Sequence, residues 1–259
     1  MIYLILGDFM EKYGIIAGTG FDKFGEDFNE ITIQTDYGIV KLKEIRNNDY
    51  VVYFIARHGE NHNISPSNIN YRANIAAMKK LNVSHIIGIC AVGSLKYDIN
   101  INNLVLANDF LDMTKNRINT FYNNDIVKHL DVSEPYNLKL NDLLKSSLEK
   151  YDFKVESGVY VCTEGPRFES KTEIKLYQML QCDVVGMTNI PEVILAAEAD
   201  ITYSLISYVT NYCTGMVEKL DDYNFSSDGI NKDYLIKSIF DVFDKNPVKL
   251  GIFSNNNLL

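Results

Sequence analysis

Short apolar runs alternate with amphipathic stretches along nearly the whole chain, and this pattern limits the possible folds more than any other feature of the sequence. Apolar runs of this length are typical of strands, and the amphipathic stretches have the length of helices. The pattern predicts strands at residues 13–17, 31–35, 38–45, 51–56, 85–90, 104–107, 158–162, 183–187 and 201–210. It predicts helices at residues 70–81, 138–151, 170–180, 191–199 and 230–244.

The order of these elements indicates how the strands are arranged. The first strands follow one another through short polar turns, whereas the later strands alternate with helices. We therefore expect an α/β fold with a central mixed sheet flanked by helices. A chain of 259 residues with 46% hydrophobic content can bury a large core, and no repeat or low-complexity linker divides it. We predict one domain at residues 13–259, with residues 1–12 as an N-terminal extension outside the fold.

Charge and cysteine content exclude several classes of protein. The formal net charge is −9 and no basic run is present, whereas nucleic acids and anionic membranes both require clustered Lys and Arg. No stretch reaches the roughly 18 apolar residues of a membrane span. The four cysteines form no C-x-x-C pair, which suits a reducing cytosol. We therefore expect a cytoplasmic protein that binds neither nucleic acid nor membrane.

The stretch YGIIAGTGFDKFG, at residues 13–25, has a glycine-rich turn directly after an apolar strand. Such turns bind dinucleotides when they follow the G-x-G-x-x-G spacing, but Gly18, Gly20 and Gly25 give G-x-G-x-x-x-x-G. The stretch also lacks the Gly-Lys-Ser/Thr of a Walker A loop. Two interpretations remain open at this point. The turn either needs a positive φ, or it holds a small oxyanion through Thr19 and neighbouring amides.

Polar residues follow several of the predicted strands, at the positions where open α/β sheets bind ligands. Arg57 and His58 end one strand, and an Arg beside a His can hold an oxyanion by charge and hydrogen bonds. The other strand ends carry Gly18-Thr19-Gly20, residues 90–94, Met187-Thr188-Asn189 and Asn211. Hydroxyls, backbone amides and one guanidinium in these positions indicate a phosphate pocket.

Other kinds of catalytic site are not visible in the sequence. The histidines, at positions 58, 62, 85 and 129, are scattered, and no acidic pair has metal-ligand spacing, so we expect neither a metal nor a cofactor. No Ser-His-Asp set is visible, and GPRFES is not a G-x-S-x-G elbow, which argues against a covalent nucleophile. A phosphate held by fixed donors could instead be the nucleophile itself.

Six stretches carry a resemblance to a known family: IIAGTGFD, ARHGENHNISPSNINYRANI, GSL, EGPRFES, GMTNIPEVILAAEA and VTN. In this order they resemble the trimeric nucleoside phosphorylases, which include purine nucleoside phosphorylase, methylthioadenosine phosphorylase and methylthioinosine phosphorylase. The match runs from about Tyr13 to Asp244. The resemblance implies the nucleoside phosphorylase fold, a homotrimer, and inorganic phosphate as a co-substrate in place of any cofactor.

The same resemblance implies roles for particular residues. The residues that would bind phosphate are Thr19, Arg57, His58, the backbone at Ala91, and Thr188. Phe168 would pack on the purine, and Met187 would lie beneath the ribose. His129 matches the residue that methylthioadenosine phosphorylase contributes from a neighbouring subunit to the 5′ pocket. Asn211 and His58 are the expected catalytic residues.

Two positions indicate which base the site accepts. Adenine-selective members carry Asp where this chain has Asn211 and Ser where it has Glu169, and both departures match the 6-oxopurine enzymes. A carboxamide can donate to the purine O6, whereas a 6-amino group would meet a donor. Glu169 can accept from the N1–H that hypoxanthine and guanine have and adenine lacks. Sites that read such a group reject the mismatched analogue by ~10⁴–10⁵ in favourable cases.

The sequence therefore predicts an enzyme that splits inosine, guanosine or 5′-methylthioinosine with phosphate. The identity of the substrate's 5′ group stays open. His129 favours a methylthio group, whereas Asn231, which follows Ile230 at the end of the predicted loop at residues 221–231, could hold a hydroxyl. The alternative within the family is a methylthioadenosine phosphorylase. The alternatives of other classes are a hydrolytic nucleosidase and a non-catalytic nucleoside-binding protein.

Overall fold

The computed structural model describes residues 10–21, 28–122, 126–217, 229–254 and 258, and every strand and helix expected from the sequence is present in it. The strands are β1 (Glu11–Ala17), β2 (Asn29–Thr35), β3 (Gly38–Arg46), β4 (Tyr50–Ala56), β5 (His85–Ser94), β6 (Leu104–Met113), β7 (Val155–Thr163), β8 (Val184–Gly186) and β9 (Thr202–Tyr212). The helices are α1 (Tyr71–Lys80), α2 (Leu138–Glu149), α3 (Lys171–Met179), α4 (Asn189–Glu198), α5 (Lys232–Asp244) and an unpredicted 3-10 helix, η1 (Pro66–Asn68).

The boundary of the expected N-terminal extension falls inside the first strand. Strand β1 begins at Glu11, so Glu11 and Lys12 pair with Tyr50 and Val51 of β4 and belong to the sheet. Residues 1–9 lie outside the described residues.

The strands form one mixed sheet in the order β2-β3-β4-β1-β5-β8-β7-β6-β9, and β9 also pairs with β5. That additional pairing closes β5, β8, β7, β6 and β9 into a ring. The pairs β2–β3 and β3–β4 are antiparallel, whereas β1–β4, β1–β5 and β5–β9 are parallel. The expected single α/β domain with a central mixed sheet flanked by helices is confirmed. The closure of the ring was not predicted.

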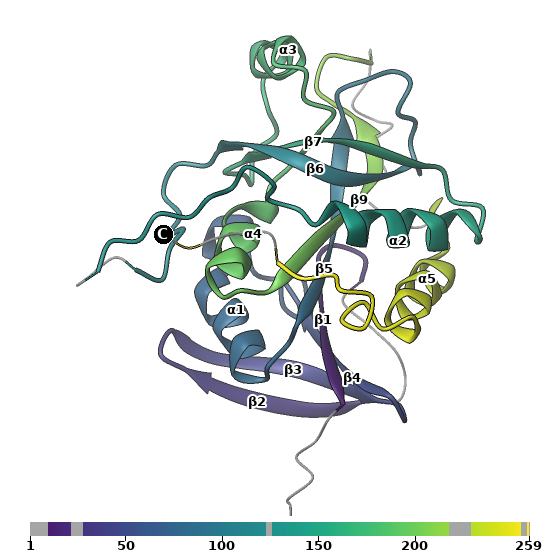
Figure 1. The fold of residues 1–259 in the computed structure, drawn as a ribbon. Coiled ribbons are helices and arrows are strands. Elements are labelled where there is room, and N and C mark those ends of the chain that lie inside the picture. The colour runs from purple at the N-terminus through teal and green to yellow at the C-terminus, as the bar shows by residue number, and fades with distance from the viewer. Residues whose placement is uncertain (1–9, 22–27, 123–125, 218–228, 255–257, 259) are drawn as a thin grey trace, which may run out of the picture.

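Helices cover both faces of the sheet (Figure 1). Helices α1 and α4 lie on one side, where Ile75 and Leu195 belong to one apolar cluster, and α2 and α5 lie on the other, where Leu144 and Ile239 belong to a second. Burying a side chain of this kind contributes about 1.5–3 kcal/mol. Four helices begin at a residue whose side chain accepts a backbone N–H. These residues are Asn70, Asn137, Ser170 and Asn231.

The parallel strands bring the predicted site residues to one edge of the sheet. Ala17, the last residue of β1, pairs with Ala56 of β4 and with Ile89 of β5. Further along, Gly93 of β5 pairs with Asn211 of β9, beyond a bulge between Val92 and Gly93. The segments that follow these positions therefore meet beside one another, as the carboxyl ends of parallel strands do in other α/β folds.

The described residues contain neither a membrane-spanning helix nor a metal-binding cluster, and their cysteines are reduced. No helix in the described part of the chain has the length and apolar character needed to cross a membrane. Within the same residues, no group of three or more His, Cys, Asp or Glu side chains is arranged to hold a metal ion. Cys90, Cys162, Cys182 and Cys213 are all buried free thiols.

Candidate active site

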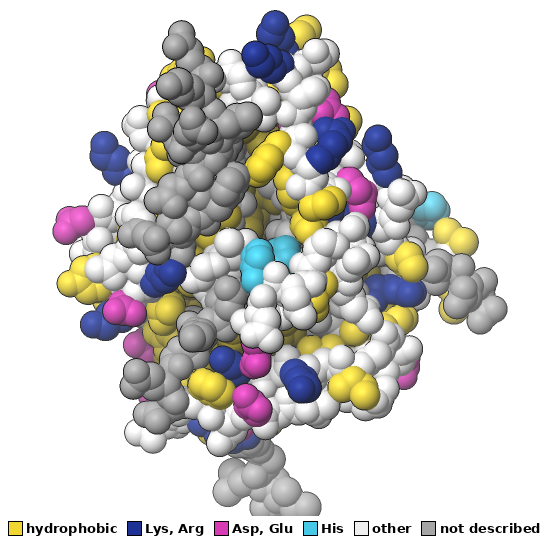
Figure 2. Space-filling model, turned by 180° about the vertical axis from the view of Figure 1, so that it is seen from behind, with side chains coloured by type: hydrophobic (Ala, Val, Ile, Leu, Met, Phe, Trp, Pro, Cys, Tyr) yellow, Lys and Arg dark blue, Asp and Glu magenta, His cyan; other side chains and the backbone are white. Residues whose placement is uncertain are grey.

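The segments at this edge of the sheet enclose a cavity of about 450 Å³. This volume lies in the range of small-molecule sites, roughly 300–1,000 Å³. Figure 2 shows the hollowed face of the molecule, with histidine and hydrophobic side chains around the hollow. The lining residues are Gly18, Thr19, His58, His62, Asn63, Ile64, Ser65, Pro66, Cys90, Ala91, Val92, Gly93, Pro166, Phe168, Glu169, Val185, Gly186, Met187, Thr188, Thr210, Asn211, Cys213 and Thr214.

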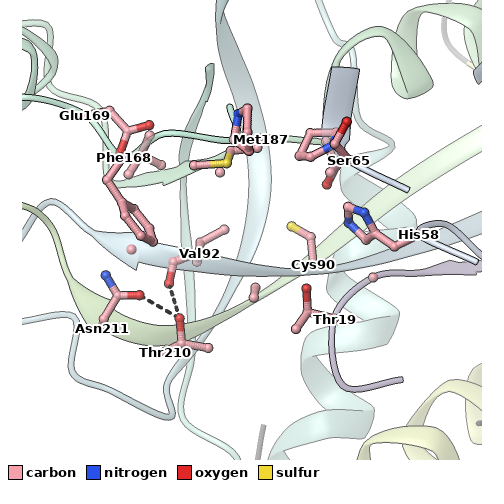
Figure 3. Close-up of a pocket in the computed structure, with 18 of the residues that line it drawn as sticks. Thr19, His58, Ser65, Cys90, Val92, Phe168, Glu169, Met187, Thr210 and Asn211 are labelled. Atoms are coloured by element: carbon pink, nitrogen blue, oxygen red, sulfur yellow. Dashed lines mark hydrogen bonds between the residues drawn. The ribbon is translucent and has the colours of Figure 1, made fainter. Parts of the chain in front are cut away.

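Most residues that the sequence assigns to phosphate do line this cavity: Thr19, His58, Ala91 and Thr188. Figure 3 shows Thr19 and His58 near one another at one end. Nδ1 of His58 lies 2.7 Å from the Ile64 carbonyl oxygen. Because a carbonyl can only accept, Nδ1 carries the proton, and the bond fixes the orientation of the ring.

The glycine-rich turn after β1 has the positive φ of the first interpretation, and its binding of an oxyanion stays a prediction. Gly20 has φ of 81°, in the left-handed region that favours glycine. Gly18 and Thr19 line the cavity, and the Tyr208 hydroxyl donates a hydrogen bond to the Thr19 carbonyl. The turn is therefore both a tight turn and part of the cavity wall.

Arg57 lies behind the cavity wall and not among its lining residues. Its side chain is fully buried, and Nε and Nη2 each donate to a Glu192 carboxylate oxygen at 2.7 Å. Burial alone would lower the pKa of Arg57, but the charge and hydrogen bonds of Glu192 raise this pKa above its ordinary value. The guanidinium is therefore charged and held in place, and its contact with phosphate stays a prediction.

The opposite end of the cavity carries the residues assigned to the base. Figure 3 shows the Phe168 ring and the Asn211 side chain at this end, with Met187 and Val92 between the two ends. The Asn211 Oδ1 atom accepts from the Thr210 hydroxyl at 2.7 Å, and Nδ2 donates to the Tyr212 carbonyl at 3.0 Å. These two bonds fix the positions of the carboxamide oxygen and nitrogen, and thus the direction in which the nitrogen can donate.

Glu169 is buried at the same end of the cavity although its neighbour Phe168 is 45% exposed. Its Oε1 atom accepts a hydrogen bond from the Thr163 hydroxyl at 2.6 Å. Burial raises the pKa of Glu169, and the hydrogen bond from Thr163 partly opposes this rise. A buried carboxylate that lines a cavity is suited to accept a hydrogen bond from a ligand.

Residues assigned to the 5′ end are not brought to this cavity by the single chain. His129 is exposed and lies outside the lining, and its role in a neighbouring subunit's pocket stays a prediction. Ile230 is buried in the cluster with α2 and α5, and the Asn231 side chain accepts from the Tyr234 amide, capping α5. Residues 221–228, most of the predicted loop at residues 221–231, lie outside the described residues.

The sequence analysis missed several lining residues. The centroid of the His62 ring lies 4.8 Å from that of His58, with the two rings tilted by 41°, and its place in the stretch that follows β4 was the one available signal. Cys213 also lines the cavity, although thiols in apolar runs are typical of plain packing. Cys90, which lies in the predicted strand-end segment at residues 90–94, lines it as well. Burial raises the pKa of Cys90 to about 11, so this thiol is not an activated nucleophile.

Comparisons with known proteins agree with this geometry. A family model described as "Phosphorylase superfamily" matches residues 12–232. The chain belongs to the phosphorylase superfamily. It is 46% identical over 207 residues to a probable S-methyl-5′-thioinosine phosphorylase from Methanocaldococcus jannaschii, covering 80% of this chain and 81% of that protein. It is 47% identical over 210 residues to a probable 6-oxopurine nucleoside phosphorylase from Dictyoglomus turgidum, covering 79% and 80%.

The fold also matches solved structures of this superfamily. A methylthioadenosine phosphorylase from an antarctic soil metagenomic library superposes with a TM-score of 0.83 at 30% identity, over 92% of this phosphorylase and 88% of that chain. The predicted family and fold are thereby confirmed. The roles of the individual site residues remain predictions.

Proposed function

We propose that this enzyme cleaves the N-glycosidic bond of 6-oxopurine nucleosides with inorganic phosphate, releasing the free purine and ribose 1-phosphate or its 5-methylthio analogue. One observation carries the proposal: Asn211 and Glu169, the pair suited to a 6-oxopurine, share a single cavity with Thr19 and His58, which are suited to phosphate. The names of the relatives from Methanocaldococcus jannaschii and Dictyoglomus turgidum support the same activity.

Phosphate is proposed to bind at the end of the cavity where β1, β4 and β5 finish. The donors are the hydroxyls of Thr19 and Thr188, the imidazole of His58 and the backbone amide of Ala91, all from residues that line the cavity. The Arg57 guanidinium lies directly behind this wall, with its charge balanced by the Glu192 carboxylate. Preorganised donors around an anion of this kind need little rearrangement when it binds.

The base is proposed to lie against Phe168 with its 6-oxo edge toward Asn211 and Glu169. The Asn211 Nδ2 atom carries two hydrogens, and the Tyr212 carbonyl accepts one of them, so the other can donate to O6. The Glu169 carboxylate can accept from N1–H. Adenine has neither the O6 acceptor nor the N1–H donor, so both contacts would be lost with a 6-aminopurine.

In the proposed reaction a phosphate oxygen forms a bond to C1′ while the C1′–N9 bond breaks. The electron pair of the broken bond moves onto the purine, through a transition state in which the ribose resembles a cation. Only interactions that strengthen in that state speed the reaction, so the Asn211 donor acts as negative charge grows on the base. His58 acts at the other end by holding the attacking phosphate.

The 5′ end of the cavity is proposed to depend on the assembly of the subunits. We propose a cytoplasmic homotrimer in which His129 of the neighbouring subunit closes the 5′ end of the cavity. The exposure of His129, away from the cavity of its own chain, supports this arrangement. Both a 5′-hydroxyl and a 5′-methylthio substrate are consistent with the described lining.

A panel of nucleosides, each assayed with and without phosphate, tests the proposal. Inosine, guanosine and 5′-methylthioinosine should release their base rapidly, and only when phosphate is present. A methylthioadenosine phosphorylase is the second candidate, because a methylthioadenosine phosphorylase of known structure superposes on this chain with a TM-score of 0.83. Rapid cleavage of 5′-methylthioadenosine with negligible turnover of the 6-oxopurine nucleosides would establish that candidate instead.

The panel also separates the proposal from classes outside phosphorolysis. Undiminished turnover after exhaustive phosphate removal would show a hydrolytic nucleosidase. Tight nucleoside binding without product, even at high enzyme concentration, would show a non-catalytic binding protein.

A further inference from the structure

The most strongly buried charged group near the cavity is not in its lining. Arg57 and Glu192 form a bidentate ion pair with both side chains fully buried, and both bonds to the carboxylate measure 2.7 Å. A buried pair of this kind is often no more stabilising than apolar residues of similar volume, because both charges lose their hydration. Stability alone therefore does not account for it.

The pair is connected to every segment that carries a proposed phosphate donor. Arg57 immediately precedes His58, and its Nη1 and Nη2 atoms donate to the carbonyls of Ile89 and Ile16 at 2.9 Å. Ile89 lies two residues before Ala91, and Ile16 lies three residues before Thr19. A single guanidinium thus holds the ends of β1, β4 and β5 in register.

Glu192 supplies the fourth connection. It lies in α4, four residues after Thr188, so its carboxylate ties the start of that helix to Arg57. The carboxylate is itself oriented, because the Tyr203 hydroxyl donates to Oε1 at 2.7 Å. The Asn189 Nδ2 atom donates in turn to the Tyr203 oxygen at 3.1 Å. This chain of buried polar groups leaves the carboxylate little freedom to turn.

The guanidinium lies directly against the cavity wall. A Cβ atom placed on Gly18, which lines the cavity, would lie 3.1 Å from Nη1. A small displacement of Arg57 would therefore move the turn that carries Thr19. Four of the five guanidinium N–H groups have partners among the described residues, and the remaining one is on Nη1.

We propose that Glu192 is a positioning residue for the phosphate end of the cavity. Its carboxylate fixes the Arg57 guanidinium, and the guanidinium aligns the donors on β1, β4, β5 and α4 around the anion. This inference rests on the proposed function of the cavity. It assigns no contact between Glu192 and any substrate.

Two substitutions separate positioning from a simple effect of charge. Glu192→Gln keeps the length of the side chain but turns one acceptor into a donor that faces the guanidinium. Glu192→Asp keeps the charge but is one methylene too short for the bidentate pair. Each should raise the KM for phosphate by about tenfold to a hundredfold, as misplacement of reacting groups does. The KM for inosine should stay close to the wild-type value.

Glu198→Gln is the matched control. Glu198 is another buried glutamate of α4, and its carboxylate accepts from the Thr120 hydroxyl and the Phe121 amide, away from the cavity. This variant should keep the wild-type KM for phosphate even if its melting temperature falls. A rise equal to that of the Glu192 variants would show that any disturbance of α4 has the same effect, and would overturn the proposal.

Other outcomes are equally decisive. A lower phosphate KM for Glu192→Gln, with a normal value for Glu192→Asp, would show that the carboxylate masks the cation. A wild-type phosphate KM in both variants would make the pair purely structural. If the single variants do not fold, Arg57→Met/Glu192→Gln removes the unpaired charge, and its phosphate KM should still be raised. A wild-type value in this double variant would overturn the proposal.

A binding measurement keeps this inference separate from the proposed reaction. Inorganic phosphate should raise the melting temperature of the wild-type protein, and the rise should shrink in both Glu192 variants but not in Glu198→Gln. This result needs no nucleoside. Failure of the wild-type protein to cleave any nucleoside would count against the reaction, whereas equal phosphate protection in all variants would count against the role of Glu192.

Discussion

Replacement of Asn211 by aspartate should change which base the enzyme accepts. The Thr210 hydroxyl, 2.7 Å from Oδ1, can still donate to the introduced carboxylate, but its other oxygen replaces Nδ2, which lies 3.0 Å from the Tyr212 carbonyl. One hydrogen bond is lost and two acceptors face one another. We expect the free energy of unfolding to fall by about 1–3 kcal/mol.

The catalytic effect of Asn211→Asp should be larger than its effect on stability. A 6-oxopurine loses its donor at O6, and removal of one such donor lowers kcat by roughly 10²–10³. A 6-aminopurine gains an acceptor for its amino group. The ratio of kcat/KM for inosine to that for adenosine should therefore fall by at least that factor, and so should the ratio for 5′-methylthioinosine to 5′-methylthioadenosine.

Matched sugars and a second variant make this test specific. Each pair of substrates differs only in its base, so an effect on the 5′ pocket cancels in the ratio. Asn211→Ala removes the donor without adding an acceptor, and should slow the 6-oxopurines without improving the 6-aminopurines. Unchanged ratios in Asn211→Asp would refute the reasoning and place base recognition elsewhere in the cavity.

Three further predictions follow from the same geometry. Gly18→Ala should raise the KM for phosphate by about tenfold, because its methyl group would crowd Arg57. Gly14→Ala, whose Cβ would lie nearest to Ile86 and Met78, is the matched control and should leave this KM unchanged. Arg57→Ala should raise the KM for phosphate far more than the KM for inosine. A wild-type KM for phosphate in this variant would show that Arg57 is not part of the phosphate site. Because burial raises the pKa of Glu169, its carboxylate is protonated at a higher pH than an ordinary glutamate, so kcat/KM for inosine should fall as pH falls through that raised pKa. Glu169→Gln should abolish this acidic limb, and an unaltered pH profile would show that another group titrates.

Much of the fold could be predicted from local sequence. Apolar runs such as the one before Gly18 form strands because side-chain periodicity decides burial, and helix starts such as Ser170 carry their own capping residues. The closure of the ring, in which β9 pairs with both β5 and β6, was beyond such reasoning. Pairing between distant strands depends on how the whole sheet curves, and this curvature cannot be predicted from any short stretch of sequence.

In the candidate site too, local features could be predicted from the sequence and long-range contacts could not. Strand ends predicted Thr19, His58, Thr188 and Asn211, and all of them line one cavity. The environment of Arg57 could not be predicted, because its partner Glu192 is 135 residues away. An arginine at a strand end has the same sequence signature whether it faces a ligand or a buried carboxylate.

The sequence offers Asn231 as a residue able to hold a 5′-hydroxyl, and this role stays a prediction. In the structure its side chain caps α5 by accepting from the Tyr234 amide. Asparagine before a helical stretch is a strong capping signal. The local sequence therefore also explains this asparagine without a ligand.

The most direct test of the central claim is the initial rate of base release from inosine and adenosine, measured in the same buffer before and after complete removal of phosphate. The account predicts rapid hypoxanthine release that stops without phosphate and returns when phosphate is added back, with adenine release far slower throughout. Faster release of adenine, or hypoxanthine release that continues without phosphate, would contradict it.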